Sequence, residues 1–261
     1  MPCPTCSSDA LTIDDALRAR IERQRAESEL SATVLLSSFF GDVAEPRDAL
    51  VSVAGVAAVA APLGVTERSV RTALNRLARD GLLVAESAGG RSFYGVSPRA
   101  KSTFAGIRRR LFRGEDTEAW DGWWTIVAID SRFGDAGARS ALRQELLWLG
   151  LGSFTPNVLL SPAVPTEAAA AVVERFDGLR VLLTRSQLVG ADGAADDAGL
   201  VWMSNDLDEV DRRYRAFEAT WRDVARSTGS PDPTLAMAGR VLLLSDLRRV
   251  VLTAPEIPHQ L

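Results

Sequence analysis

The segment 64–83, "GVTERSVRTALNRLARDGLL", constrains the fold more than any other, because it predicts a helix with two chemically different faces. Thr66 is a residue type that favours the N-cap position, and Gly81 is typical of a helix end. The apolar residues between them recur at helical spacing: Val70, Leu74 and Leu77. One side of this helix must therefore pack against a core built from other parts of the chain.

The opposite side of this helix is rich in arginine and in short polar side chains. Arginine pairs with phosphates and guanine edges, and hydroxyl and amide groups contact the DNA backbone and base edges at close range. Glu67 stands alone against four arginines. The helix residues expected to contact DNA are Thr66, Arg68, Ser69, Arg71, Thr72, Asn75, Arg76 and Arg79. A helix that only packs within the protein is the alternative.

Two helices are expected before this segment. "SELSATVLLSSFF" predicts a helix that is capped by Ser28 or Ser31 and ended by Gly41. "SVAGVAAVAAPL" predicts a short second helix whose small residues allow close packing. Residues 1–28 predict only a tail or a loose helix, and no role is assigned to them.

A β-hairpin is expected after the segment, because "LLVAESAGGRSFYGVSP" alternates apolar and polar residues on both sides of two glycines. Three helices and a hairpin in this order predict a winged helix-turn-helix, where the third helix enters the major groove and the wing lies on flanking phosphates. The wing residues expected to contact DNA are Gly89, Gly90, Arg91 and Ser92. Phe93 and Tyr94 are expected to pack within the wing strands.

The distribution of charge agrees with DNA binding. The formal net charge is −4, yet between Pro62 and Arg113 eleven basic residues stand against three acidic ones. One basic module in an otherwise acidic chain is typical of a DNA-binding domain joined to an acidic effector or dimerisation body.

Features that the sequence lacks exclude several classes of protein. His259 is the only histidine, and Cys3 and Cys6 form a C-x-x-C without the second ligand pair that zinc requires. No phosphate-binding glycine loop or nucleophile motif is found, so we expect no enzymatic activity, metal or cofactor, and two incidental thiols. No apolar run reaches roughly 18 residues and no secretory leader is visible, so we expect a cytoplasmic protein without a membrane partner.

Residues 115–190 predict a ferredoxin-like domain. "WWTIVAID" is typical of a strand, "DAGARSALRQELLWLG" of a helix, "GSFTPNVLLSPAVP" of one or two strands, "TEAAAAVVERFDG" of a helix capped by Thr166, and "LRVLLTRSQLV" of a further strand. Strand, helix, strand pair, helix and strand is the ferredoxin-like order.

The last part of the chain predicts helices. After a linker at 191–199, an aromatic stripe recurs at helical spacing: Leu207, Val210, Tyr214, Phe217, Trp221 and Val224. We interpret it as core, with a ligand pocket or a dimer contact as alternatives. "LAMAGRVLLLSDLRRVVLT" predicts a second helix. The expected fold class is α+β, with a winged helix-turn-helix and linker helix at 29–114, a ferredoxin-like domain at 115–190 and a helical domain at 200–261.

Several of these stretches together resemble a known family. "GVTERSVRTALNRLARDGLLVAE" resembles the recognition helix of GntR-type winged helices. Combined with "FFGD", "PRDAL", "RSFYGVSP" and "WDGWWTIVAID", it resembles the PaaX family of transcriptional repressors, over residues 29–258. The join of "ERSVRTAL" with "WDGWW" at Trp120–Trp124 is the most specific part of this resemblance.

The resemblance implies a homodimer that binds a roughly palindromic operator in double-stranded DNA. It also implies release by a small acidic effector, an aryl-acyl-CoA such as phenylacetyl-CoA, and control of aromatic degradation. The basic helix that leads into the tryptophan cluster is expected to move on release. Its arginines Arg108, Arg109 and Arg110 could instead contact DNA phosphates or the phosphates of CoA.

The sequence departs from the family pattern near its end. The family commonly carries His-Glu-Tyr before the paired arginines Arg248 and Arg249, where this chain has Ser245, Asp246 and Leu247. If those residues serve the inducer, the effector here differs. We would also expect further helix after "PEIPHQL".

Two rival functions remain open from the sequence. The middle domain of the family is similar to small CRISPR-associated nucleases, which place a metal-binding aspartate where Asp130 stands, at the end of the first strand. A single carboxylate is weak support for two-metal chemistry, so we interpret Asp130 as a cap of the strand end or turn. A winged-helix protein that binds a partner other than DNA is the second rival.

Overall fold

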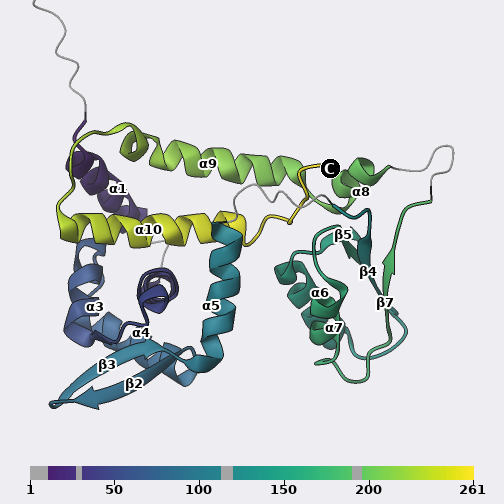
Figure 1. The fold of residues 1–261 in the computed structure, drawn as a ribbon, viewed down its shortest axis with the longest axis horizontal. Coiled ribbons are helices and arrows are strands. Elements are labelled where there is room, and N and C mark those ends of the chain that lie inside the picture. The colour runs from purple at the N-terminus through teal and green to yellow at the C-terminus, as the bar shows by residue number, and fades with distance from the viewer. Residues whose placement is uncertain (1–10, 28–30, 113–119, 190–195) are drawn as a thin grey trace, which may run out of the picture. The chain divides into compact units, whose positions relative to one another are not determined.

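The computed structural model describes residues 11–27, 31–112, 120–189 and 196–261 (Figure 1). It confirms the mixed α+β class, with two small antiparallel sheets among helices. The chain packs as two compact units, of which one spans Met1–Leu111 and Arg215–Arg249 and the other Phe112–Tyr214 and Val250–Leu261. Cys3, Cys6, Ser28 and Arg113 lie outside the described residues.

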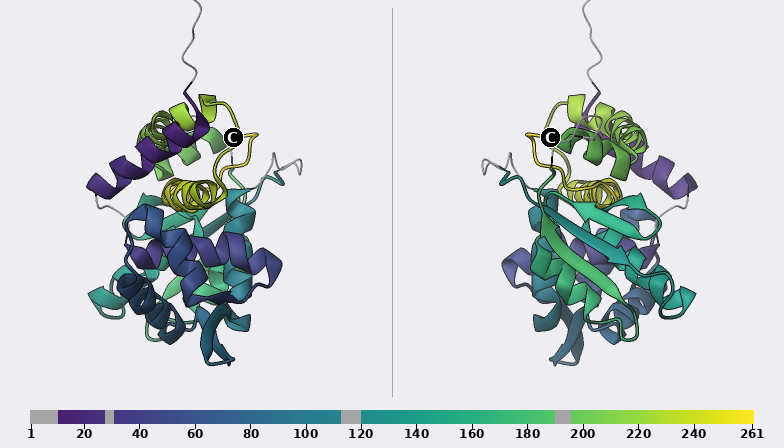
Figure 2. Two further views of the ribbon diagram at one scale, coloured as in Figure 1. Left: turned by 90° about the vertical axis from the view of Figure 1, so that its left-hand side faces the viewer. Right: turned by 90° about the vertical axis from the view of Figure 1, so that its right-hand side faces the viewer.

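The elements of the first unit pack around one large apolar core. Its helices are α1 (Ile13–Glu27), α2 (Ala32–Phe39), α3 (Val53–Ala60), α4 (Glu67–Arg79), α5 (Pro98–Leu111), most of α10 (Pro233–Val251) and the second half of α9 (Leu207–Arg226). Its sheet has the order β1-β3-β2, with β1 (Val51–Ser52), β2 (Leu83–Ala88) and β3 (Arg91–Val96). The left view of Figure 2 looks at this unit.

The local elements of this unit form largely where the sequence predicts them. Ser31 is the N-cap of α2, as expected, and Ser52 is the N-cap of α3. The hairpin turns at Gly89 and Gly90, which both have positive φ, of 58° and 72°. Two consecutive residues with positive φ make the turn whose twist matches a two-residue hairpin, and glycine adopts this conformation without strain.

The expectation that Gly41 ends the first helix is wrong. The helical path continues beyond α2 as a π-helical segment, Phe40–Ala44, and then as a 3-10 turn, Glu45–Arg47. A side chain at Gly41 would collide with Phe104 of α5 and Arg248 of α10. This glycine therefore permits a close approach of three helices instead of a stop.

Residues 13–27 form a packed helix, whereas the sequence predicts only a tail or a loose helix over 1–28. Helix α1 buries Ala16, Leu17 and Ile21 against the core. Arg20 is only 4% exposed, and its Nη2 atom lies 2.6 Å from Oδ2 of Asp246 on α10. The indole N–H of Trp221 on α9 donates to the same oxygen at 3.0 Å. One carboxylate, whose side chain is 13% exposed, thus joins α1, α9 and α10.

The second unit is built on a four-stranded antiparallel sheet with the order β5-β6-β4-β7. The strands are β4 (Trp124–Ile129), β5 (Gly152–Thr155), β6 (Val158–Ser161) and β7 (Val181–Ser186). Helices α6 (Ala136–Leu149) and α7 (Thr166–Val173) pack with Val127 and Leu159 on one face, whereas α8 (Asp197–Ser204) packs with Trp124 and Leu160 on the other. The right view of Figure 2 faces this sheet.

The sequence predicts that Thr166 caps α7, and this prediction is wrong. Pro165 occupies the N-cap position, and Thr166 is the first helical residue. The hydroxyl of Thr166 instead lies 3.0 Å from that of Thr125 on β4.

The residues 200–261 divide their contacts between the two units. Helices α9 and α10 form where helices are expected. Of the aromatic stripe of α9, Trp221 is buried in the core of the first unit and Phe217 packs against that core, whereas Leu207 packs against the cluster of Trp124, Leu160 and Val201 in the second unit. Tyr214 remains 37% exposed.

Among the described residues, no single helix has the length and apolar character needed to cross a membrane. The segments Val53–Leu63 and Glu67–Arg79 meet that criterion only when taken together, and they are bent by 119° relative to each other.

We predict that Asp246→Ala lowers the free energy of unfolding by about 3–5 kcal/mol, because it leaves the Arg20 guanidinium buried without its partner. Arg212→Ala, which removes an exposed ion pair with Glu209, is the matched control and should cost about 0.5 kcal/mol or less. Urea denaturation of the purified variants measures both. Equal losses in the two variants would show that the buried pair is unimportant.

Candidate nucleic-acid interface

Helix α4 has the two faces that its sequence predicts. Thr66 is its N-cap and accepts a hydrogen bond from the backbone N–H of Ser69 at 3.2 Å. Val70 and Leu74 are fully buried, and Ala73 and Leu77 are nearly so. These residues pack in the core with residues of α2 and α3, which fixes the side of α4 that faces outward.

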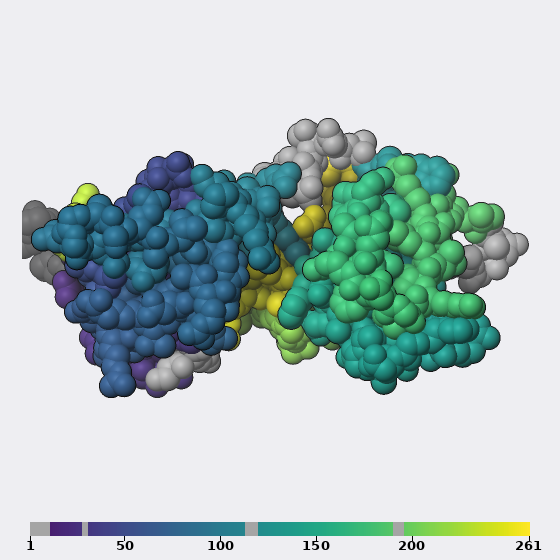
Figure 3. Space-filling view, turned by 90° about the horizontal axis from the view of Figure 1, so that it is seen from below, coloured from purple at the N-terminus to yellow at the C-terminus, as the bar shows by residue number. Residues whose placement is uncertain are grey.

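The outward face carries every helix residue that was expected to contact DNA. All of them are exposed, except that Ser69 is half-buried. At about 100° per residue, the line opposite the buried stripe is a central ridge of four side chains: Arg68, Thr72, Asn75 and Arg79. Arg71 lies on one flank of this ridge and Arg76 on the other. The blue surface in Figure 3 includes this segment and the hairpin.

The arginines of α4 differ in whether they have an acidic partner. On the flanks, Arg71 pairs with Glu67 at 2.6 Å, and Arg76 approaches Asp80 at 3.9 Å. On the ridge, neither Arg68 nor Arg79 forms an ion pair with any residue that the structure describes. The ridge therefore presents two positive charges that no carboxylate in the described part of the chain neutralises.

A buried side chain of the hairpin forms a hydrogen bond with α4. Tyr94 on β3 is 8% exposed, as expected for a packing residue, and its hydroxyl donates to Oδ1 of Asn75 at 3.3 Å. The tip residues Gly89, Gly90, Arg91 and Ser92 are exposed. A shallow hollow of about 460 Å³ lies on α4 beside this contact, and its lining is Thr72, Asn75, Arg76, Arg79 and Asp80.

The basic helix α5 is bound to the segment 40–48. Arg108 forms an ion pair with Glu45 and donates to the carbonyl of Gly41 at 3.4 Å, and Lys101 pairs with Asp48 at 2.7 Å. Arg108 therefore has an internal partner, whereas contact with the phosphates of DNA or of CoA was the alternative left open by the sequence. The sequence gives no local indication of this, because 63 residues separate Arg108 from Glu45.

The carboxylate of Asp130 is bound by an arginine two residues further along the chain. Arg132 donates from Nε at 3.0 Å and from Nη2 at 2.8 Å, and its backbone N–H donates to Oδ1 at 3.0 Å. The hydrogen bonds from Arg132 lower the pKa of Asp130 from 3.8 to about 2. No group of three or more His, Cys, Asp or Glu residues able to hold a metal occurs in the described part of the chain. Asp130 thus caps the turn after β4.

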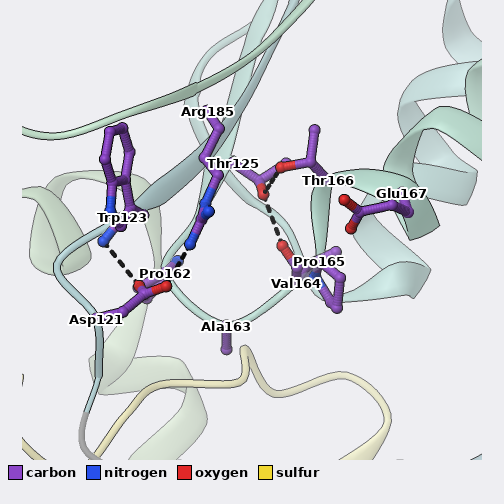
Figure 4. Close-up of a pocket in the computed structure, with 10 residues that line it drawn as sticks. All are labelled: Asp121, Trp123, Thr125, Pro162, Ala163, Val164, Pro165, Thr166, Glu167 and Arg185. Carbon is purple, nitrogen blue, oxygen red and sulfur yellow. Dashed lines mark hydrogen bonds and ion pairs between the residues drawn. The ribbon is translucent and has the colours of Figure 1, made fainter.

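The tryptophan cluster is mainly structural. Trp124 is 1% exposed, its Nε1 donates to Asp197 at 2.8 Å, and Trp120 packs edge-on against it at 5.9 Å. Trp123 is 37% exposed and lines a pocket of about 320 Å³ (Figure 4). Figure 4 shows Arg185 and Asp121 bonded at one side of this pocket, with Thr125 and Thr166 at the other.

The residues that replace the expected His-Glu-Tyr have internal partners. Ser245 is 1% exposed and donates to the carbonyl of Val241 at 2.8 Å. Asp246 binds Arg20 and Trp221. Arg248 binds both carboxylate oxygens of Asp42 at 2.9 Å. Asp246 and Arg248 therefore join α10 to other helices of the first unit, whereas Ser245 bonds within α10 itself.

Comparison with known proteins covers almost the whole chain. Residues 31–100 match the model of a PaaX-like protein, 117–199 that of the PaaX protein central Cas2-like domain, and 205–261 that of a PaaX-like protein C-terminal domain. The transcriptional repressor PaaX of Escherichia coli (strain K12) is 28% identical over 237 residues, which are 89% of this chain and 74% of that protein.

A solved structure has a similar fold. The uncharacterized protein Rv0674 from Mycobacterium tuberculosis matches with a TM-score of 0.57 and 24% identity, over 88% of this chain and 86% of that one.

We predict that Arg132→Ala raises the pKa of Asp130 from about 2 toward 3.8, because it removes the hydrogen bonds that stabilise the carboxylate. Since the folded pKa is depressed, this contact stabilises the fold above about pH 4 and is lost as the pH falls toward 2. A carbon-detected NMR titration of the Asp130 carboxyl measures the shift. An unchanged pKa would rule out Arg132 as its cause.

Proposed function

The chain belongs to the PaaX family, a family of transcriptional regulators and not of enzymes, and on this basis we propose that it represses genes of aromatic catabolism by binding operator DNA. The observation that carries the proposal is the ridge of α4. It places two unneutralised arginines and two short polar side chains on the exposed side of a helix whose other side is locked in the core.

The element order supports a winged helix-turn-helix as the DNA-binding domain, within 29–114. Helices α2, α3 and α4 are followed by the β2–β3 hairpin, and β1 pairs with β3 to complete a small sheet. In this arrangement α4 enters the major groove and Arg91 and Ser92 at the tip of the wing lie on flanking phosphates. Such a helix reads base edges with side chains from its N-terminal half.

The middle domain, 115–190, supports a ferredoxin-like assignment. Its elements follow one another as strand, helix, two strands, helix and strand, and the strand order is β5-β6-β4-β7. We propose that the protein acts as a homodimer on a roughly palindromic operator, since two symmetric subunits require two symmetric half-sites.

We propose that an aryl-acyl-CoA, such as phenylacetyl-CoA, releases the repressor. The effector must prefer the conformation that misaligns the two DNA-binding domains, because equal affinity for both conformations shifts no equilibrium. Because Ser245 and Asp246 have internal partners, we do not assign them to the effector site.

Binding to DNA from upstream of the protein's own gene tests the function. We expect tight binding at fixed salt that weakens on addition of phenylacetyl-CoA, and no response to the free acid or to acetyl-CoA. Tight binding that ignores every acyl-CoA would remove the effector and keep the repressor. Binding no tighter than to random DNA would contradict the repressor and favour a protein partner.

We predict that Arg68→Ala and Arg79→Ala each weaken binding to operator and to random DNA roughly tenfold, because each loses a charged contact with a phosphate. The slope of log affinity against log salt should fall by about 0.9 for each substitution. Fluorescence anisotropy at several salt concentrations measures both quantities. Arg222→Ala, an exposed arginine of α9, is the matched control and should change neither.

A further inference from the structure

Arg71 is held by Glu67 in a specific orientation. Both its Nε and its Nη2 donate to the same carboxylate oxygen, Oε1 of Glu67, at 3.2 and 2.6 Å. The two side chains are one helical turn apart and each is 60% exposed. Glu67 is the only acidic residue in the first turn of α4.

The contact leaves one edge of the guanidinium available. A guanidinium has a side edge, made of Nε and one terminal nitrogen, and an end edge, made of the two terminal nitrogens. Glu67 occupies the side edge of Arg71. Among the described residues no hydrogen bond from Nη1 is found, so the end edge points away from Glu67 with its donors free.

The free edge matches one base in particular. Two parallel N–H donors fit the O6 and N7 acceptors of guanine in the major groove, which is the commonest specific contact between a side chain and a base. A phosphate is a poorer partner here, because the carboxylate of Glu67 would lie beside it and repel it. The pair also lies toward the N-terminus of α4, the part of a recognition helix that reaches base edges.

Stability does not explain the pair. An ion pair between two exposed side chains in water contributes little to folding, since solvent screens it and the side chains lose freedom. The ion pair instead orients Arg71, because it restricts a long side chain that would otherwise sample many conformers.

We propose that Glu67 is a positioning residue that presents the end edge of Arg71 to one guanine in each operator half-site. The inference rests on the proposed DNA-binding function. It separates the arginines of α4 into two kinds: Arg68 and Arg79 supply affinity that does not depend on sequence, and Arg71 supplies specificity.

Selection from a library of DNA duplexes with randomised half-sites, followed by sequencing, tests the proposal with the full-length protein. The wild type should enrich guanine at one position of each half-site. Arg71→Ala should abolish that preference alone, and Glu67→Gln should reduce it at least threefold. Glu67→Gln should also bind random DNA more tightly, because Arg71 becomes free to contact phosphates and one negative charge is lost.

Two further variants separate positioning from a general effect of charge. Glu86→Gln removes an equal charge from the hairpin, where no arginine partner is found among the described residues, and should leave the guanine preference intact. In the Arg71→Ala background, Glu67→Gln should change no base preference, because Glu67 acts through Arg71. Circular dichroism checks that all the variants fold. We expect them to fold, because the substituted positions are exposed.

Three results would contradict the account in distinguishable ways. If Arg71→Ala abolishes the guanine preference but Glu67→Gln leaves it unchanged, Glu67 has no positioning role. Loss of the preference in Glu86→Gln as well would reduce that role to net charge. If the wild type enriches no sequence at all, the proposed operator-binding function itself is wrong.

Discussion

The buried ion pair between Asp42 and Arg248 is the contact on which the first unit depends. The carboxylate is fully buried, the guanidinium is 10% exposed, and two hydrogen bonds of 2.9 Å join them. Asp42 lies in the π-helical continuation of α2, and Arg248 also packs over the ring of Phe104 on α5. Removal of either partner would leave a buried charge uncompensated. The packing of α10 against α2 and α5 therefore depends on this ion pair.

The position of α4, the helix proposed to contact DNA, depends on this arrangement. Val70 and Leu74 of α4 pack in the same core as α2. The π-helical segment after α2 is held by Arg248, which binds Asp42, and by Arg108, which donates to the carbonyl of Gly41. The outward direction of α4 is thus set by contacts with residues distant in the chain. The close approach at Gly41 makes this packing possible, since any side chain there would meet Phe104 and Arg248.

The sequence predicts those features that depend on neighbouring residues. The Thr66 N-cap, the apolar stripe of α4 and the turn at Gly89 and Gly90 all form as expected, because each is decided within one turn of helix or hairpin. The exposure of the α4 residues follows from the same periodicity. The continuation through Gly41 and the docking of α1 are not predictable in this way, because the partners Arg248 and Asp246 lie more than 200 residues away. The bond between Tyr94 and Asn75 spans only 19 residues, but periodicity does not show that the hydroxyl of one reaches the amide of the other.

Site-directed cleavage of DNA tests most directly whether α4 lies in the major groove. A cleavage reagent is attached at Thr72→Cys on the ridge, in protein whose Cys3 and Cys6 are replaced by serine. The account predicts cuts at two symmetric positions in the operator, separated by about one helical turn or a multiple of it. Cuts spread evenly along the DNA, or cuts that appear only when the reagent is placed at Arg222→Cys on α9, would contradict it.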